Sequence, residues 1–249
     1  MTIPCRTIDT AGPNLFGDGI DSDPWVAFHG TSSSLESNID SEGLDSSHAR
    51  FSRTELAAVV AIFDRLDWAG EHLGGFPVLK PWSLGFDRSN GERPPLYLAE
   101  SSHRAALYAT QEFAGGEAAR ALRYAFHDLR RYSEGFIGEG TADERYWVRS
   151  QLEALSSTEC AARQFSEHHA YGVVYAFRLQ PSDLPQLTYS TSMGIIASSG
   201  LTPDRCLAKL LVPRDWEHLP MTDRRRLERQ SEEGLITSIR QRDAAQRVD

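Results

Sequence analysis

The first clear hydrophobic pattern of the chain is a short apolar block, residues 25–28, which predicts a buried strand. Apolar residues then recur at helical spacing over residues 35–44 and end beside Gly43, so this part predicts a short helix with a glycine C-cap. A polar run separates the two elements. The pattern therefore predicts a strand that delivers polar groups at its end.

The polar run begins with His29, Gly30 and Thr31 and continues through the serines at 32–34. Because glycine lets a ligand approach the backbone, a strand that ends in these residues is typical of a binding site. Ser32 and the serines after it are equally suited to capping the helix. A purely structural role for His29 is the alternative interpretation.

A second strand and helix of the same kind begin about 66 residues after His29. Residues 97–99 predict a strand, and a serine cap at 101 or 102 opens a helix to about residue 113. Tyr97 lies on this strand, and Tyr108 lies eleven positions later on the helix. Each tyrosine is suited either to ligand contact or to ordinary packing in the core.

The rest of the chain mixes predicted helices with predicted strands, which together favour an α+β domain over residues 1–249. Residues 1–23 predict an irregular arm, residues 74–95 a loop that is either a lid or a connector, and residues 221–249 a charged helix. The helices are predicted over residues 54–73, 117–131 and 141–167, the last broken near 156, and the strands over 172–179, 187–197 with a kink at Gly194, and 207–212.

Composition narrows the class of partner and compartment. The net charge of −9 makes the chain a poor general binder of nucleic acid, because phosphate neutralisation needs clustered cations. Arginine supplies nearly all the positive charge, which is typical of a bacterial source. The three cysteines lack metal-ligand spacing, so no metal is expected. Without an apolar run of membrane length or a signal peptide, we expect a cytoplasmic protein or one exported without a cleavable signal peptide.

The two strand–helix stretches together resemble the ADP-ribosyltransferase superfamily, in its diphtheria-toxin-like and PARP-like branch. There the first strand carries His-Gly-Ser/Thr, which His29-Gly30-Thr31 matches. The second strand carries a tyrosine and the next helix another, eleven positions later, as Tyr97 and Tyr108 are here. The resemblance covers about half of the chain. It implies two packed, mainly antiparallel sheets with a central cleft for NAD, and helical insertions.

The resemblance also implies a role for each matched residue. The backbone of Gly30 would hold the nicotinamide carboxamide, and the rings of Tyr97 and Tyr108 would face the pyridinium, since a cation over an aromatic ring is favourable. The imidazole of His29 would bond a ribose hydroxyl, and Thr31, with Ser32 beside it, would reach the second ribose. NAD is then the co-substrate.

The third motif of the family departs from its pattern in this chain. The family usually has a glutamate at the position that falls at or near Ile195, but no Asp or Glu lies between Asp183 and Asp204. The enzyme then transfers a single ADP-ribose without this residue, or another carboxylate replaces it, or the domain binds NAD without catalysis. Glu100 is the nearest replacement by motif. In addition, Ala105 stands where the family often has a serine.

We therefore predict a mono-ADP-ribosyltransferase that cleaves NAD, with His29, Tyr108 and Glu100 as the catalytic residues. Its acceptor, whether protein, nucleic acid or small molecule, is unidentified, and a bacterial toxin or effector is the biological role that the family suggests. One alternative is a catalytically inactive NAD or ADP-ribose-binding module, which Ile195 favours. Another is an NAD-dependent enzyme similar to RNA 2′-phosphotransferases, although a basic pair near His29 is missing.

Overall fold

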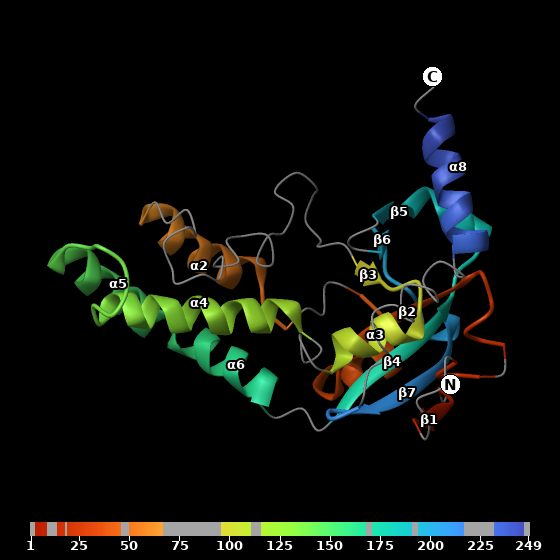
Figure 1. The fold of residues 1–249 in the computed structure, drawn as a ribbon, viewed down its shortest axis with the longest axis horizontal. Helices are drawn as coiled ribbons and strands as arrows, with labels where there is room; N and C mark the ends of the chain where they lie inside the picture. Colours follow the sequence, from red (N-terminus) through yellow and green to blue (C-terminus); the bar gives the residue numbers. More distant parts are fainter. Residues whose placement is uncertain are drawn as a thin grey trace. The chain divides into compact units, whose positions relative to one another are not determined.

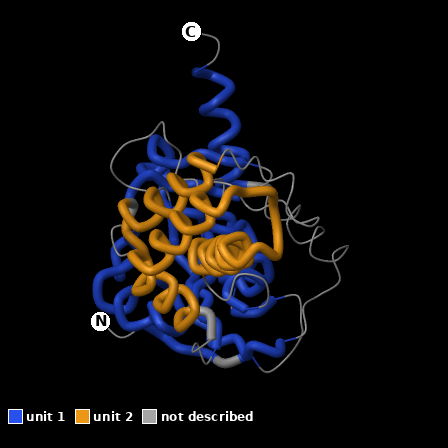
Figure 2. The backbone as a smooth tube through the Cα atoms, turned by 90° about the vertical axis from the view of Figure 1, so that its left-hand side faces the viewer, with its two compact units in different colours: residues 1–48, 93–115, 169–249 blue, residues 49–92, 116–168 orange. Residues whose placement is uncertain are grey.

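The computed structural model describes most of the chain and divides it into two compact units (Figure 2). Unit 1 contains every described strand, and unit 2 is helical. The prediction of a single domain over residues 1–249 stays a prediction. The described residues are 3–8, 14–17, 19–45, 50–66, 96–110, 116–167, 171–190, 194–216 and 232–246; unit 1 spans 1–48, 93–115 and 169–249, and unit 2 spans 49–92 and 116–168.

Unit 1 is built on two sheets (Figure 1). The larger has the order β1-β7-β4-β2, with β1 parallel to β7 and the other pairs antiparallel; the smaller is antiparallel with the order β3-β6-β5. The predicted α+β class with two mainly antiparallel sheets is thus confirmed. The strands are β1 (Cys5–Thr7), β2 (Val26–Ser32), β3 (Leu96–Leu98), β4 (Tyr171–Arg178), β5 (Leu187–Ser190), β6 (Gly194–Ala197) and β7 (Cys206–Pro213).

The larger sheet is buried on both faces. On one face Tyr175 and Phe177 pack in the same core as Leu98 and Ile195 of the smaller sheet. On the other face, alternate residues such as Val174 pack against helix α3 (Ser102–Ala109), which Figure 1 shows lying across the sheet. This double burial explains why the central strands are nearly continuous apolar runs in the sequence.

β2 is longer than predicted. It continues through Ser32 because each residue up to Ser32 pairs with β4, where Ser32 is matched with Gly172. A 3₁₀ turn (Ser33–Leu35) and helix α1 (Glu36–Glu42) follow. Gly43 then ends the helix at φ +87°, with its N–H bonded to the Ile39 carbonyl, so the predicted glycine cap is confirmed.

Unit 2 packs α4 against α5, α6 and α2. Ser52 caps α2, because its hydroxyl accepts a hydrogen bond from the Glu55 N–H while the Glu55 carboxylate accepts one from the Ser52 N–H. Thr141 and Glu144 form the same motif at the start of α5. The predicted break falls at Leu155. The helices are α2 (Arg53–Arg65), α4 (Glu117–Ser133), α5 (Ala142–Ala154) and α6 (Ser156–Glu167).

The ends of the chain correct the sequence interpretation in one respect. The arm predicted to be irregular contains β1, which the sequence pattern missed because its partner β7 lies about 200 residues away. In the charged tail, a π-helical turn (Glu232–Ile236) leads into helix α8 (Thr237–Ala245). The predicted loop over residues 74–95 lies outside the described residues. Among the described helices, none is long and apolar enough to cross a membrane.

Candidate functional site

The two sheets are joined at one pair of residues, Phe28 on β2 and Ala99 just after β3. These residues exchange both backbone hydrogen bonds, at N···O distances of 2.9 and 2.6 Å. Continuation of that antiparallel register would set Gly30 opposite Tyr97, but among the described residues the bridge is isolated. The edge of β2 therefore parts from β3 at Gly30.

The backbone N–H and C=O of Gly30 point to the edge of β2 where the pairing with β3 has ended. Backbone groups of successive strand residues point to alternate edges. The Trp25 carbonyl bonds Leu179 on the β4 side, whereas the Phe28 peptide bonds Ala99 on the β3 side. By this alternation the N–H and C=O of Gly30 point to the β3 side, two residues beyond the bridge. A backbone donor and acceptor thus lie side by side at an edge where β3 does not pair with them.

Because Gly30 has no side chain, helix α3 can pack directly against β2. A Cβ at Gly30 would lie 1.8 Å from the carbonyl oxygen of Ala105 and 3.1 Å from the amide nitrogen of Ala109. A Cβ at Gly172 of β4 would lie 2.6 Å from the Ala109 carbonyl oxygen. The backbone of α3 therefore rests directly on two neighbouring strands, and Gly30 is required there whatever binds at its edge.

His29 is held by a hydrogen bond from its ring to β3. Its Nδ1 lies 3.0 Å from the backbone carbonyl oxygen of Tyr97. Because a carbonyl oxygen only accepts, Nδ1 carries the proton, and in the neutral ring Nε2 is left as an acceptor. Burial lowers the pKa of His29, and the bond to Tyr97 only partly opposes this effect. The imidazole is therefore neutral at pH 7.

The remaining family-matched residues lie on β2, β3 and α3. Tyr97 lies on the outward face of β3 with 42% of its surface exposed, while Leu96 and Leu98 are buried. Tyr108 is half-buried in the last turn of the helix that packs on Gly30. Thr31 is buried in β2. The Ser32 hydroxyl accepts the Ser34 N–H, which fits the capping alternative.

Glu100 is buried and lies further along the register. Since Phe28 matches Ala99, Glu100 falls opposite Ala27, away from Gly30. Its Oε1 accepts a hydrogen bond from Arg104 at 2.7 Å. Its Oε2 is buried without a hydrogen-bond partner and lies 3.1 Å from where a Cβ on Gly194 would be. Gly194 directly precedes Ile195, so Glu100 places a carboxylate beside the segment that lacks one.

The pairing of β3 with β6 shows why Ile195 is apolar. Ile195 is matched with Leu98, and both side chains are buried in the core. The half-buried Ile196 is the residue matched with Tyr97 on the outward face. A carboxylate that is to lie beside Tyr97 on this face would thus replace Ile196.

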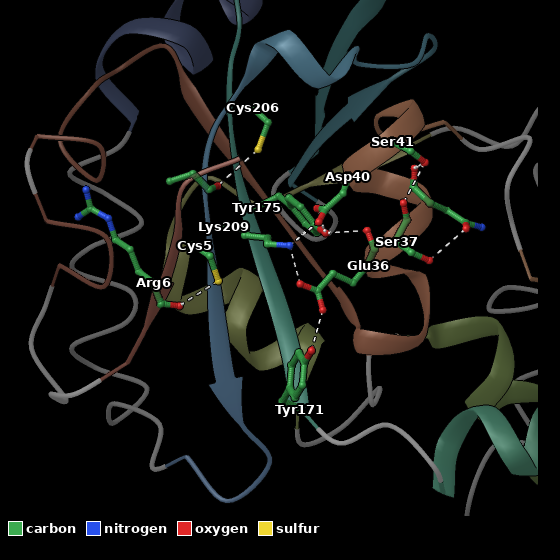
Figure 3. A network of polar contacts seen from close by, with 12 residues as sticks. Cys5, Arg6, Glu36, Ser37, Asp40, Ser41, Tyr171, Tyr175, Cys206 and Lys209 are labelled. Atoms are coloured by element: carbon green, nitrogen blue, oxygen red, sulfur yellow. Dashed lines mark hydrogen bonds and ion pairs between the residues drawn. The ribbon is translucent and has the colours of Figure 1, made fainter. Parts of the chain in front are cut away.

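Sequence reasoning missed a cluster of polar residues over the larger sheet (Figure 3), whose Tyr175 is matched with His29 of β2. It consists of Glu36, Asp40, Tyr171, Tyr175 and Lys209. The available signal was Lys209, a charged residue inside an otherwise apolar predicted strand. A lysine at such a position needs a buried partner.

Comparisons with protein-family models, with curated proteins and with solved structures found no match. Within the part of the chain that the structure describes, no group of three or more His, Cys, Asp or Glu side chains is placed to hold a metal ion. The chemistry of the site is therefore argued from its own residues.

Proposed function

We propose that this protein is a mono-ADP-ribosyltransferase with an ADP-ribosyltransferase-like fold, whose NAD cleft opens where β2 parts from β3. The observation that carries the proposal is the edge of Gly30, which presents one backbone donor and one acceptor beside the neutral imidazole of His29. A primary carboxamide such as that of nicotinamide offers the complementary acceptor and donor.

The proposed reaction breaks the bond between the nicotinamide nitrogen and C1′ of its ribose. The bonding electron pair leaves with nicotinamide, and the acceptor supplies the pair that forms the new bond to C1′ while its proton passes to solvent. His29 Nε2 would accept a hydrogen bond from a ribose hydroxyl and so fix the sugar. The rings of Tyr97 and Tyr108 would hold the pyridinium, a contact worth roughly 0.5–2 kcal/mol.

Glu100 is the carboxylate that we assign to stabilising positive charge on the ribose. The substitution Glu100→Gln keeps the shape and a hydrogen-bond acceptor for Arg104 but removes the charge. We expect nicotinamide release to slow by about tenfold or more, with the Kd for NAD unchanged, because charge matters most in the transition state. Steady-state release and calorimetric NAD titration measure the two effects. An unchanged rate would leave Glu100 as no more than the partner of Arg104.

Incubation of the purified protein with NAD tests the function itself. A transferase or glycohydrolase releases free nicotinamide, which chromatography detects, and labelled ADP-ribose on a protein, nucleic acid or small molecule identifies transfer. The apolar Ile195 and Ile196 favour a second candidate, a module that binds NAD or ADP-ribose without cleaving it. Saturable binding without release would select that candidate, and the absence of both would contradict the proposal.

NAD binding should weaken at acid pH. The pKa of His29 is lowered from its ordinary value of about 6.5, so Nε2 accepts hydrogen bonds throughout the neutral range. As pH falls through the lowered pKa, Nε2 gains a proton and becomes a donor, and the bond to the ribose hydroxyl is lost. We expect the Kd for NAD to be constant above pH 7 and to rise only as the pH falls through the lowered pKa, as a fluorescence titration at several pH values would measure. A Kd that stays flat over the pH range in which an NMR titration shows the His29 imidazole gaining its proton would exclude this role for His29.

A further inference from the structure

His29 belongs to a row of residues that crosses the larger sheet. It is matched with Tyr175 on β4, Tyr175 with Lys209 on β7, and Lys209 with Cys5 on β1. Residues matched in this way place their side chains on the same face of the sheet. Neighbouring strands lie about 4.8 Å apart, so the backbones of His29 and Lys209 are separated by roughly 10 Å.

An ion cluster lies over this row (Figure 3). The ammonium of Lys209, a residue only 7% exposed, contacts Glu36 Oε1 at 2.5 Å and also Asp40 Oδ2. Both carboxylates come from α1, the helix that follows β2. Tyr175 donates its hydroxyl to Asp40 at 2.9 Å, and Tyr171 donates to Glu36 at 2.7 Å. The five side chains fasten α1 to the sheet with one positive and two negative charges.

The two tyrosines of this cluster are neutral near pH 7, and its lysine is charged. Burial and a hydrogen bond to Asp40 raise the pKa of Tyr175, and a hydrogen bond to Glu36 raises that of Tyr171. Burial acts to lower the pKa of Lys209, but the hydrogen bonds and charges of Asp40 and Glu36 outweigh it and raise that pKa, so the lysine stays charged. Among the described residues, the titratable groups matched with His29 along the row are Tyr175 of β4, Lys209 of β7 and Cys5 of β1, and Glu36, Asp40 and Tyr171 are bonded to that row. The imidazole itself is bonded to the Tyr97 carbonyl of β3.

We propose that Lys209 is a positioning residue for the His29 site: it balances Glu36 and Asp40 and so acts together with burial to keep the imidazole in the neutral form that accepts hydrogen bonds through Nε2. Without the ammonium, two uncompensated carboxylates would face the row that contains His29. Their field would favour the imidazolium, which cannot accept a hydrogen bond from a ribose hydroxyl. The functional meaning of this inference rests on the proposed role of His29.

NMR titration of the His29 imidazole tests the inference, with the resonance assigned by its loss in His29→Gln. Lys209→Met should raise the pKa of His29 by roughly half a unit to one unit, if the charge acts over a distance similar to the roughly 10 Å between the two backbones. Lys209→Met combined with Asp40→Asn restores the net charge of the cluster and should return the pKa toward the wild-type value. Glu36→Gln should lower it.

The matched control is Arg130→Met in unit 2, which breaks an ion pair to Glu159 of 2.6–2.7 Å and should leave the pKa of His29 unchanged. An unmoved pKa in Lys209→Met, or one that Asp40→Asn does not restore, would overturn the inference. If Lys209→Met does not fold, Glu36→Gln decides: a lowered pKa of His29 supports the inference, and an unchanged or raised pKa overturns it. The titration needs no NAD. If the wild type does not cleave NAD, the proposed function is contradicted, but the effect of Lys209 on the pKa of His29 can still be measured.

Discussion

Replacing Gly30 with alanine should destabilise unit 1 by about 3 kcal/mol or more, the upper range for overpacking a core. The added Cβ would lie 1.8 Å from the Ala105 carbonyl oxygen. The obstacle is backbone, so no side-chain rotation relieves the contact, and α3 or β2 must move. Urea denaturation followed by circular dichroism measures the loss.

Two further variants test whether the loss of stability comes from the close contact between α3 and the sheet. Gly172→Ala should also be strongly destabilising, because its Cβ would meet the backbone of Ala109 on the same helix. Ser37→Ala, on the exposed side of α1, should change the free energy of unfolding by less than about 0.5 kcal/mol. A Gly30→Ala protein as stable as Ser37→Ala would show that α3 does not rest on β2 as described.

Replacing His29 with alanine should reduce nicotinamide release by about 10²- to 10³-fold, the range for removing one well-placed hydrogen-bonding group from a transition state. His29 is half-buried, and its hydrogen bond to the Tyr97 carbonyl fixes the orientation of the imidazole that would bind the ribose. The change should cost the fold only about 1 kcal/mol, the value of one hydrogen bond. Release kinetics and thermal unfolding measure the two effects separately.

His127→Ala provides the matched control for this substitution. His127 is an exposed histidine on α4 of unit 2, and its removal should alter neither release nor unfolding. If His29→Ala keeps the wild-type rate, NAD is cleaved elsewhere or by another enzyme in the preparation. If His29→Ala loses NAD binding and the wild type binds without release, the site belongs to a binding module.

Local signals in the sequence predicted local structure well. The glycine cap at Gly43 and the helix break at Leu155 each depend on residues within one or two turns. The extension of β2 through Ser32 and the existence of β1 depend instead on pairing with strands far away in the sequence. No local pattern carries that information, so these features had to come from the structure.

In the candidate site, too, the sequence indicated some residues, while their contacts became known only from the structure. The resemblance predicted the importance of His29 and Tyr97, and the structure brings them together through a hydrogen bond between residues 68 positions apart. The tyrosine contributes its carbonyl to that bond, a role that no side-chain motif can indicate. Likewise, the partners of Lys209 lie 173 and 169 positions earlier in the chain. Their identity follows from the fold and not from the strand that carries the lysine.

The division into units has a consequence for how this protein can diversify. Every described strand lies in unit 1, and the chain enters unit 2 in two separate excursions, residues 49–92 and 116–168. Insertions, deletions or exchanges within these excursions remove no residue of the seven described strands. Natural variants, or engineered chimaeras that join residue 48 to 93 and 115 to 169 through new helical segments, can therefore change unit 2 while inheriting the His29 strand intact.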